Sequence, residues 1–248
     1  MIPIGDDNRD RRTKPVVTWA LIAVNVFVFA FYQGFGANDR FTYAYATVPG
    51  EILSGKDIVT PDRTLVDRST GRRYLVPGLQ PTPVTVFLTL FISMFMHAGL
   101  AHILGNMLYL LIFGDNVEDR LGHFRYFLFY LFCGVIASLA QVYATLFTGR
   151  SLTVPSLGAS GAISGVLGAY LLLFPRKRVR VLIAVFIVPV PAFVAVGIWF
   201  VFQLVNGLGY LGGGSSGGVA YAAHIGGFIA GFATVKIWGA GRGAPAAP

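Results

Sequence analysis

Residues 159–174 read ASGAISGVLGAYLLLF, a run without a single charged side chain. As a helix, sixteen residues rising 1.5 Å each extend about 24 Å. A membrane's hydrocarbon core is about 30 Å thick, so this helix falls several ångströms short of crossing it. The basic stretch at residues 176–180, RKRVR, follows directly and suits the headgroup region. We therefore expect the other end of this helix, at Ser160, to begin inside a membrane.

Further apolar runs lie on both sides of this one. Hydrophobic residues make up 55% of the 248-residue chain and charged residues only 12%, against roughly 25% charged in soluble domains. The mean hydropathy is +0.67. We predict an all-α polytopic membrane protein, a bundle of six transmembrane helices with a short fourth helix. The expected spans are residues 16–33, 98–113, 124–147, 159–174, 181–205 and 217–238, with a polar loop at 114–120 and a kink at Pro189 and Pro191 in the fifth span.

The remaining segments give the domain organisation. Residues 1–15 form a polar N-terminal tail, residues 16–238 the membrane domain, and residues 239–248 a C-terminal tail. Within the domain, residues 34–96 are predicted to be an external loop that can hold small helices. Its last part, 85–96, has hydroxyls at Thr85, Thr89 and Ser93, the four-residue spacing of a half-submerged helix.

The charge pattern predicts orientation and location. The net charge is +8, but the basic residues lie in short clusters between apolar runs, which argues against nucleic acid as a partner and for the lipid bilayer. Short basic loops would lie on the same side as both termini, so we expect cytoplasmic termini. Acidic residues among the first fourteen argue against a transit peptide. We expect a multi-pass protein of a bacterial inner membrane.

One group of polar residues lies at the start of the second span. His97, His102 and Asn106 fall within ten residues, and His102 and Asn106, four apart, share a helix face. No acid lies inside a predicted span, and the lone Cys133 has no partner, so we expect neither a metal nor another cofactor. An imidazole and an amide side by side are instead suitable donors to a developing oxyanion. The alternative interpretation of each histidine is a hydrogen-bonded packing contact.

A second group pairs a serine with a histidine. Ser160 lies between Gly158 and Gly161 where the short helix begins, and His224 lies near the start of the last span. Small residues at 218, 222, 226 and 230, with a GxxxG at 227–231, predict close packing of the last span against the short helix. That packing would bring His224 to Ser160 at a similar depth. A serine nucleophile needs such a base; the alternative is that Ser160 only caps its helix.

These three motifs together resemble the signature of rhomboid intramembrane serine proteases. The resemblance covers about residues 85–238 and implies the six-helix rhomboid fold and cleavage of transmembrane protein substrates in or near their membrane segments. It implies that Ser160 is the nucleophile and His224 the general base, that His102, Asn106 and the Ser160 backbone N–H bind the oxyanion, with Gly158 beside them, and that His97 supports the site. It also likens the fifth span to a lateral gate. Ser164 stands where several rhomboids have a tyrosine near the histidine.

Two other functions fit parts of the pattern. A catalytically inactive rhomboid-like protein would bind membrane-protein clients without cleaving them, although such relatives typically lack the serine or the histidine. A small-solute transporter would use the polar cavity for passage, but matching broken helices in two halves of the chain are not evident. Labelling of Ser160 by a fluorophosphonate separates the protease from the first alternative.

Overall fold

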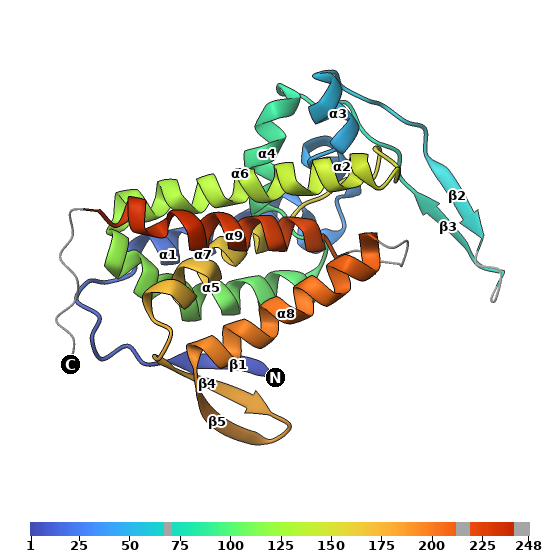
Figure 1. Cartoon of the computed structure of the whole chain (residues 1–248). Coiled ribbons are helices and arrows are strands. Elements are labelled where there is room, and N and C mark those ends of the chain that lie inside the picture. The colour runs from blue at the N-terminus through green and yellow to red at the C-terminus, as the bar shows by residue number, and fades with distance from the viewer. Residues whose placement is uncertain (67–70, 212–218, 241–248) are drawn as a thin grey trace.

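The computed structural model describes residues 1–66, 71–211 and 219–240, and the described chain is mostly helical (Figure 1). The central helix is α7 (Ser160–Leu173), whose residues 161–170 are all buried. Around it pack α5 (Leu100–Leu121), α6 (His123–Phe147), α8 (Ala192–Leu211) and α9 (Tyr221–Trp238). Helix α1 (Val16–Phe27), which continues as the π-helix η1 (Val28–Tyr32), packs against α5.

Three of the described helices are long and apolar enough to cross a membrane: α5, α6 and residues 192–209 of α8. The segments 16–32 and α7 are apolar but shorter, and the beginning of the predicted last span, residues 217 and 218, lies outside the described residues. The short fourth helix is confirmed. The count of six spans stays a prediction.

The long loop before α5 contains small elements. These are η2 (Gly34–Gly36), α2 (Asp39–Tyr45), α3 (Pro49–Ser54), the antiparallel hairpin β2 (Arg63–Val66) and β3 (Arg73–Val76), and the broken helix η3 (Val86–Leu88), α4 (Thr89–Ile92) and η4 (Ser93–Phe95). Thr89 and Ser93 face the protein: the Thr47 hydroxyl donates to the Thr89 carbonyl at 3.0 Å and lies 2.8 Å from Ser93 Oγ. The predicted helix at 85–96 is therefore present, and the Ser93 hydroxyl and the Thr89 carbonyl bind it to the loop, while the Thr89 hydroxyl donates to the Val86 carbonyl at 2.6 Å.

The predicted polar loop at 114–120 is wrong, because these residues form the last two turns of α5. Their polar groups find partners in the N-terminal segment, so the helix continues. The buried Glu118 accepts from Val17 N at 2.8 Å, from Thr18 N at 2.7 Å and from Thr18 Oγ at 2.7 Å, which caps α1. His123, expected in a loop, is the first residue of α6, with Nδ1 2.6 Å from Glu118 Oε1. Acidic residues therefore do lie within a candidate span.

The kinked fifth span is also wrong. Its first half is the hairpin β4 (Arg178–Ile183) and β5 (Phe186–Pro191), and β1 (Ile2–Asp6) completes a sheet of order β1-β4-β5. The β-branched residues of this segment suit strands, and its two prolines fall on the edge strand, where an N–H is not required. Helix α8 begins only at Ala192. The class is thus helical with two small sheets, not all-α.

Helices α7 and α9 pack backbone against backbone. A Cβ added to Gly227 would overlap the carbonyl oxygen of Gly161, and one added to Gly231 would overlap that of Gly165. Gly226 instead faces Ala140 of α6. The predicted GxxxG therefore makes the contact with the short helix, while Gly226 of the other small-residue row packs on α6.

Candidate active site

The structure brings Ser160 and His224 together. Ser160 is the first residue of α7 and His224 lies in the first turn of α9, with His224 Nε2 2.8 Å from Ser160 Oγ. The glycine contacts between the two helices hold this spacing, because a side chain at Gly227 or Gly231 would separate the backbones. At this distance a proton can pass from the hydroxyl to the imidazole.

A third residue, Gln203 of α8, contacts the other side of the imidazole. Its side chain is 5% exposed, and its Oε1 lies 2.8 Å from His224 Nδ1. Since an amide oxygen only accepts, the contact places the proton of the neutral ring on Nδ1 and leaves Nε2 free to accept from Ser160. Gln203 is not among the site residues predicted from the sequence. Gln203 is the only amide or charged side chain in residues 192–205, and that exception was the available signal.

Aromatic rings surround the same histidine. The centroid of the Trp199 ring, one turn before Gln203, lies 6.1 Å from that of His224, and the Tyr221 ring lies 6.5 Å away. Ser164 takes no part in this environment, because its hydroxyl donates to the Ser160 carbonyl at 2.6 Å. The aromatic neighbours of the imidazole therefore come from α8 and α9 and not from α7.

His102 lies beside the serine. The Ala98 N–H donates to His102 Nδ1 at 3.3 Å, which places the proton of the neutral ring on Nε2. A Cβ added to Gly158 would lie 3.0 Å from His102 Nε2 and 3.6 Å from Ser160 Oγ. Gly158 has φ +130°, and its N–H donates to the Ser93 carbonyl at 2.9 Å. Only glycine suits this position, since both the backbone and the imidazole exclude a side chain.

Asn106 and His97 complete the polar group. Asn106 is buried one turn after His102, and among the described residues its Nδ2 has no hydrogen-bond partner. His97 is fully buried with its ring 5.1 Å from that of His102. Its backbone is held by Gln33, which accepts from His97 N at 2.8 Å and donates to the His97 carbonyl at 3.0 Å. His97 thus positions the His102 ring by packing.

These side chains line one cavity of about 930 Å³. Ser160, His224, His102, Asn106 and His97 all contribute to its wall, and the rest comes from the segments around residues 36–49, 141–157 and 219–220. The volume falls at the upper end of what ligand-binding sites have. A serine hydroxyl, a histidine within hydrogen-bond distance of it and further hydrogen-bond donors therefore face one space large enough for a peptide segment.

A helical core around a short buried helix, with a serine and a histidine at one end, describes a polytopic membrane protein with a hydrolase-like site. The Rhomboid domain model matches residues 85–240, well over half of the chain, and the chain belongs to the rhomboid family. The match includes every residue of the site described above except Gln33 and the part of the cavity wall from residues 36–49.

Several curated relatives agree. The chain is 33% identical over 156 residues to Rhomboid protein 1, mitochondrial, of Saccharomyces cerevisiae, which covers 62% of this chain and 42% of that protein. It is 35% identical over 135 residues to RHOMBOID-like protein 1 of Arabidopsis thaliana, a match that covers 52% of this chain and 32% of that protein. It is 33% identical over 117 residues to the Presenilin-associated rhomboid-like protein, mitochondrial, of Bos taurus, a match that covers 43% of this chain and 30% of that protein. The chain thus spans less than half the length of these relatives.

The expected bacterial inner membrane is contradicted by these relatives. The yeast and bovine proteins and a second Arabidopsis relative, RHOMBOID-like protein 6, carry mitochondrial names, which points to a mitochondrial membrane. The expectation of cytoplasmic termini came from the loop charges and was part of the same prediction of location, so it is overturned with it. Loop charges bear on which way a chain inserts and carry no information on which membrane receives it.

Proposed function

We propose that this protein is an intramembrane serine protease that uses a Ser160–His224 dyad to hydrolyse peptide bonds in or near the transmembrane segments of other membrane proteins. The observation that carries the proposal is the 2.8 Å approach of His224 Nε2 to Ser160 Oγ in a polar cavity. Membership of the rhomboid family supports it.

The reaction begins with transfer of the Ser160 proton to His224 Nε2 as Oγ attacks the peptide carbonyl carbon. The imidazolium then gives that proton to the leaving amine, which breaks the C–N bond and leaves an acyl-serine. His224 next removes a proton from water, and the resulting hydroxide attacks the ester. Return of the proton to Oγ releases the carboxylic acid product and restores the dyad.

Gln203 is a positioning residue in this scheme. Its Oε1 accepts from His224 Nδ1–H and holds the ring in the tautomer that can accept from Ser160. The amide is neutral, so it stabilises the imidazolium less than a carboxylate would. We therefore describe the catalytic pair as a dyad oriented by a third side chain.

The tetrahedral oxyanion would be held by three donors: the Ser160 backbone N–H at the start of α7, His102 Nε2–H and Asn106 Nδ2–H. The first is one of the N–H groups that a helix N-terminus leaves without an intrahelical acceptor. His102 Nε2 lies next to Gly158 at the serine turn. Asn106 has a buried donor without a partner in the described residues, and such a donor favours a ligand that accepts a hydrogen bond.

We propose that the protein is a six-helix bundle and that the substrate enters it laterally from the surrounding lipid, beside α8, as an extended segment. A tight transmembrane helix has its carbonyls in hydrogen bonds, so cleavage sites should contain small or helix-destabilising residues. The cavity supplies the space and the water that hydrolysis needs below the membrane surface.

The test is cleavage of a panel of transmembrane peptides by the wild type and Ser160→Ala in proteoliposomes, with products mapped by mass spectrometry. Defined products from the wild type, lost with Ser160→Ala, support the proposal. A matched control is Ser164→Ala, which lies on the same helix but bonds only to a backbone carbonyl. Fluorophosphonate should label the wild type and Ser164→Ala but not Ser160→Ala. Absence of both cleavage and labelling in folded protein would indicate a non-catalytic binding protein.

A further inference from the structure

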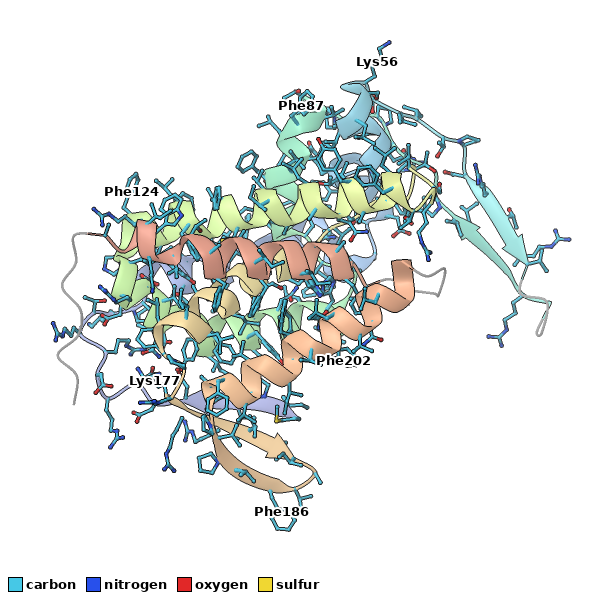
Figure 2. The ribbon with its side chains drawn as sticks, in the orientation of Figure 1. Lys56, Phe87, Phe124, Lys177, Phe186 and Phe202 are labelled. Carbon is cyan, nitrogen blue, oxygen red and sulfur yellow. The ribbon has the colours of Figure 1, made fainter. Side chains whose placement is uncertain are left out.

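The hairpin β4–β5 has two chemically different ends. At its base, residues 176–180 read RKRVR, and Arg178 and Arg180 are exposed while Val179 and Val181 between and after them are buried. Its distal part, residues 181–188, reads VLIAVFIV and contains no polar side chain. Val185 is 81% exposed, Phe186 70% and Ile187 60%. Figure 2 shows Phe186 pointing away from the helices at the tip, and Lys177 at the opposite end.

The free edge of β5 offers few hydrogen-bond donors. Arg178 O accepts from Asp7 N at 3.1 Å on one side of β4, and Lys177 O accepts from Ala192 N at 2.9 Å on the other. The backbone N–H and C=O groups of successive residues point to alternate sides of a strand, so those of Val179, Val181 and Ile183 point toward β5, as Lys177 O does. The residues of β5 that pair with these three point their own N–H and C=O groups back toward β4. Residues 187, 189 and 191 therefore face outward. Two of these are prolines, so Ile187 alone presents an outward N–H in this strand.

Such a hairpin is unfavourable in water. A contiguous apolar tip on an exposed edge strand is a site of aggregation, and no described element covers it. A membrane interface suits the apolar tip, the arginines at the base and the edge with few N–H donors. Apolar side chains enter the acyl region, arginines contact phosphates, and the missing N–H groups remove the cost of leaving donors unsatisfied. The outward carbonyls still need hydrogen-bond donors such as water, so the edge of β5 must remain at headgroup depth.

We propose that the β4–β5 hairpin is a lipid-binding anchor. Its tip, residues 183–187, inserts into the outer part of the adjacent lipid monolayer, and Arg178 and Arg180 bind anionic phospholipid headgroups. The interaction surface is separate from the cavity and does not depend on the proposed proteolysis. It gives the membrane a fixed contact immediately before α8, the helix that carries Gln203.

Site-directed spin labelling tests the depth of the tip. Nitroxides are attached in a Cys133→Ala background to Phe186→Cys and, as a matched control, to Leu75→Cys, which is 66% exposed on β3 of the other hairpin. The labelled proteins are placed in phosphatidylcholine vesicles with phosphatidylglycerol. At 186, collisions with oxygen should exceed those with a water-soluble nickel complex, and at 75 the order should reverse.

Two results would overturn the proposal. A label at 186 as accessible to nickel as the one at 75 would place the tip in water. A label shielded from both reagents would mean that protein, such as a second copy of this chain, covers it. The charge component has its own test: Arg178→Gln with Arg180→Gln should move the 186 label toward water in the anionic vesicles but not in phosphatidylcholine alone. An equal change in both lipids would remove the headgroup contact from the proposal.

Discussion

Two asparagines ten residues apart on α5 occupy opposite kinds of environment. Asn116, at the closed end of the bundle, donates to Asp6 Oδ2 at 2.8 Å and to Asn8 Oδ1 at 2.6 Å and accepts from Lys177 Nζ at 2.5 Å. Asn106, at the cavity end, is equally buried, yet within the described chain its Nδ2 has no partner. An unpaired buried donor costs free energy. One end of the helix therefore uses its polar groups for stability, and the other keeps a donor available for a ligand.

The largest expected effect is at Asn106. Asn106→Ala should lower kcat by about 10²- to 10³-fold, as removal of an oxyanion donor does elsewhere, while the melting temperature stays the same or rises. Cleavage kinetics and thermal unfolding in the same detergent measure the two. Asn116→Ala is the matched control, with lower stability and an unchanged kcat. If both variants lost only stability, the contrast between the two ends would be wrong.

Glu118 tests how much the closed end contributes. Glu118→Ala leaves the first N–H groups of α1 and the Thr18 hydroxyl without their acceptor, so it should lower the free energy of unfolding by roughly 2–3 kcal/mol. Reversible unfolding in mixed micelles gives the value. Thr18→Val, which removes one of the three contacts of Glu118 with α1, should cost less than half as much. If Glu118→Ala left the free energy of unfolding unchanged, water would have replaced the carboxylate as the acceptor.

Gln203 lies at the cavity end and should affect rate alone. Gln203→Met keeps the volume but removes the acceptor for His224 Nδ1, and should lower kcat by about 10- to 100-fold with little change in KM. Gln203→Glu should recover activity, since a carboxylate also accepts from Nδ1. Nitrogen-15 NMR of the histidine ring separates orientation from general damage: the tautomer ratio should change in Gln203→Met. A lowered rate with an unchanged tautomer would contradict the positioning role.

The last effect depends on pH and concerns the closed end. Burial raises the pKa of Asp6 from 3.8 to about 6, against the lowering by hydrogen bonds from Tyr170 and Asn116 and the charge of Lys177. The folded state thus holds a proton that the unfolded state has already lost, so stability is highest below about pH 4 and falls as the pH rises to about 6. Asp6→Asn should remove this slope, which amounts to about 3 kcal/mol for that shift in pKa.

Asp7 is the control for the pH experiment. Its hydrogen bonds from Arg9 lower its pKa to about 2, so its own contribution is lost only as the pH falls toward that value. Asp7→Asn should therefore leave the slope between pH 4 and pH 6 intact. If Asp7→Asn removed the slope and Asp6→Asn did not, the assignment to the buried carboxyl would be wrong.

The sequence predicted the structure best where a local pattern of residue types is compatible with only one structure. The short apolar run, the serine turn and the GxxxG before Lys236 predicted α7, its packing on α9 and the approach of His224 to Ser160. It was least informative where a long-range partner decides the structure. Residues 114–120 looked like a loop because the groups that hydrogen-bond to their carboxylates, about a hundred residues earlier in the chain, were unknown. Residues 181–191 looked like a helix because an apolar run does not reveal that β1 will pair with it.

The glycine contacts between α7 and α9 have a consequence for how this architecture diversifies. Two backbones set the spacing of the reacting atoms, so neighbouring side chains can vary without altering the chemical step. In the proposed protease, changes in the cavity wall at residues 36–49 would then alter substrate choice, while a single methyl group at Gly161, Gly227 or Gly231 would prevent cleavage of every substrate alike. In this protein the selectivity for substrates and the rate of the chemical step would therefore depend on different segments of the chain.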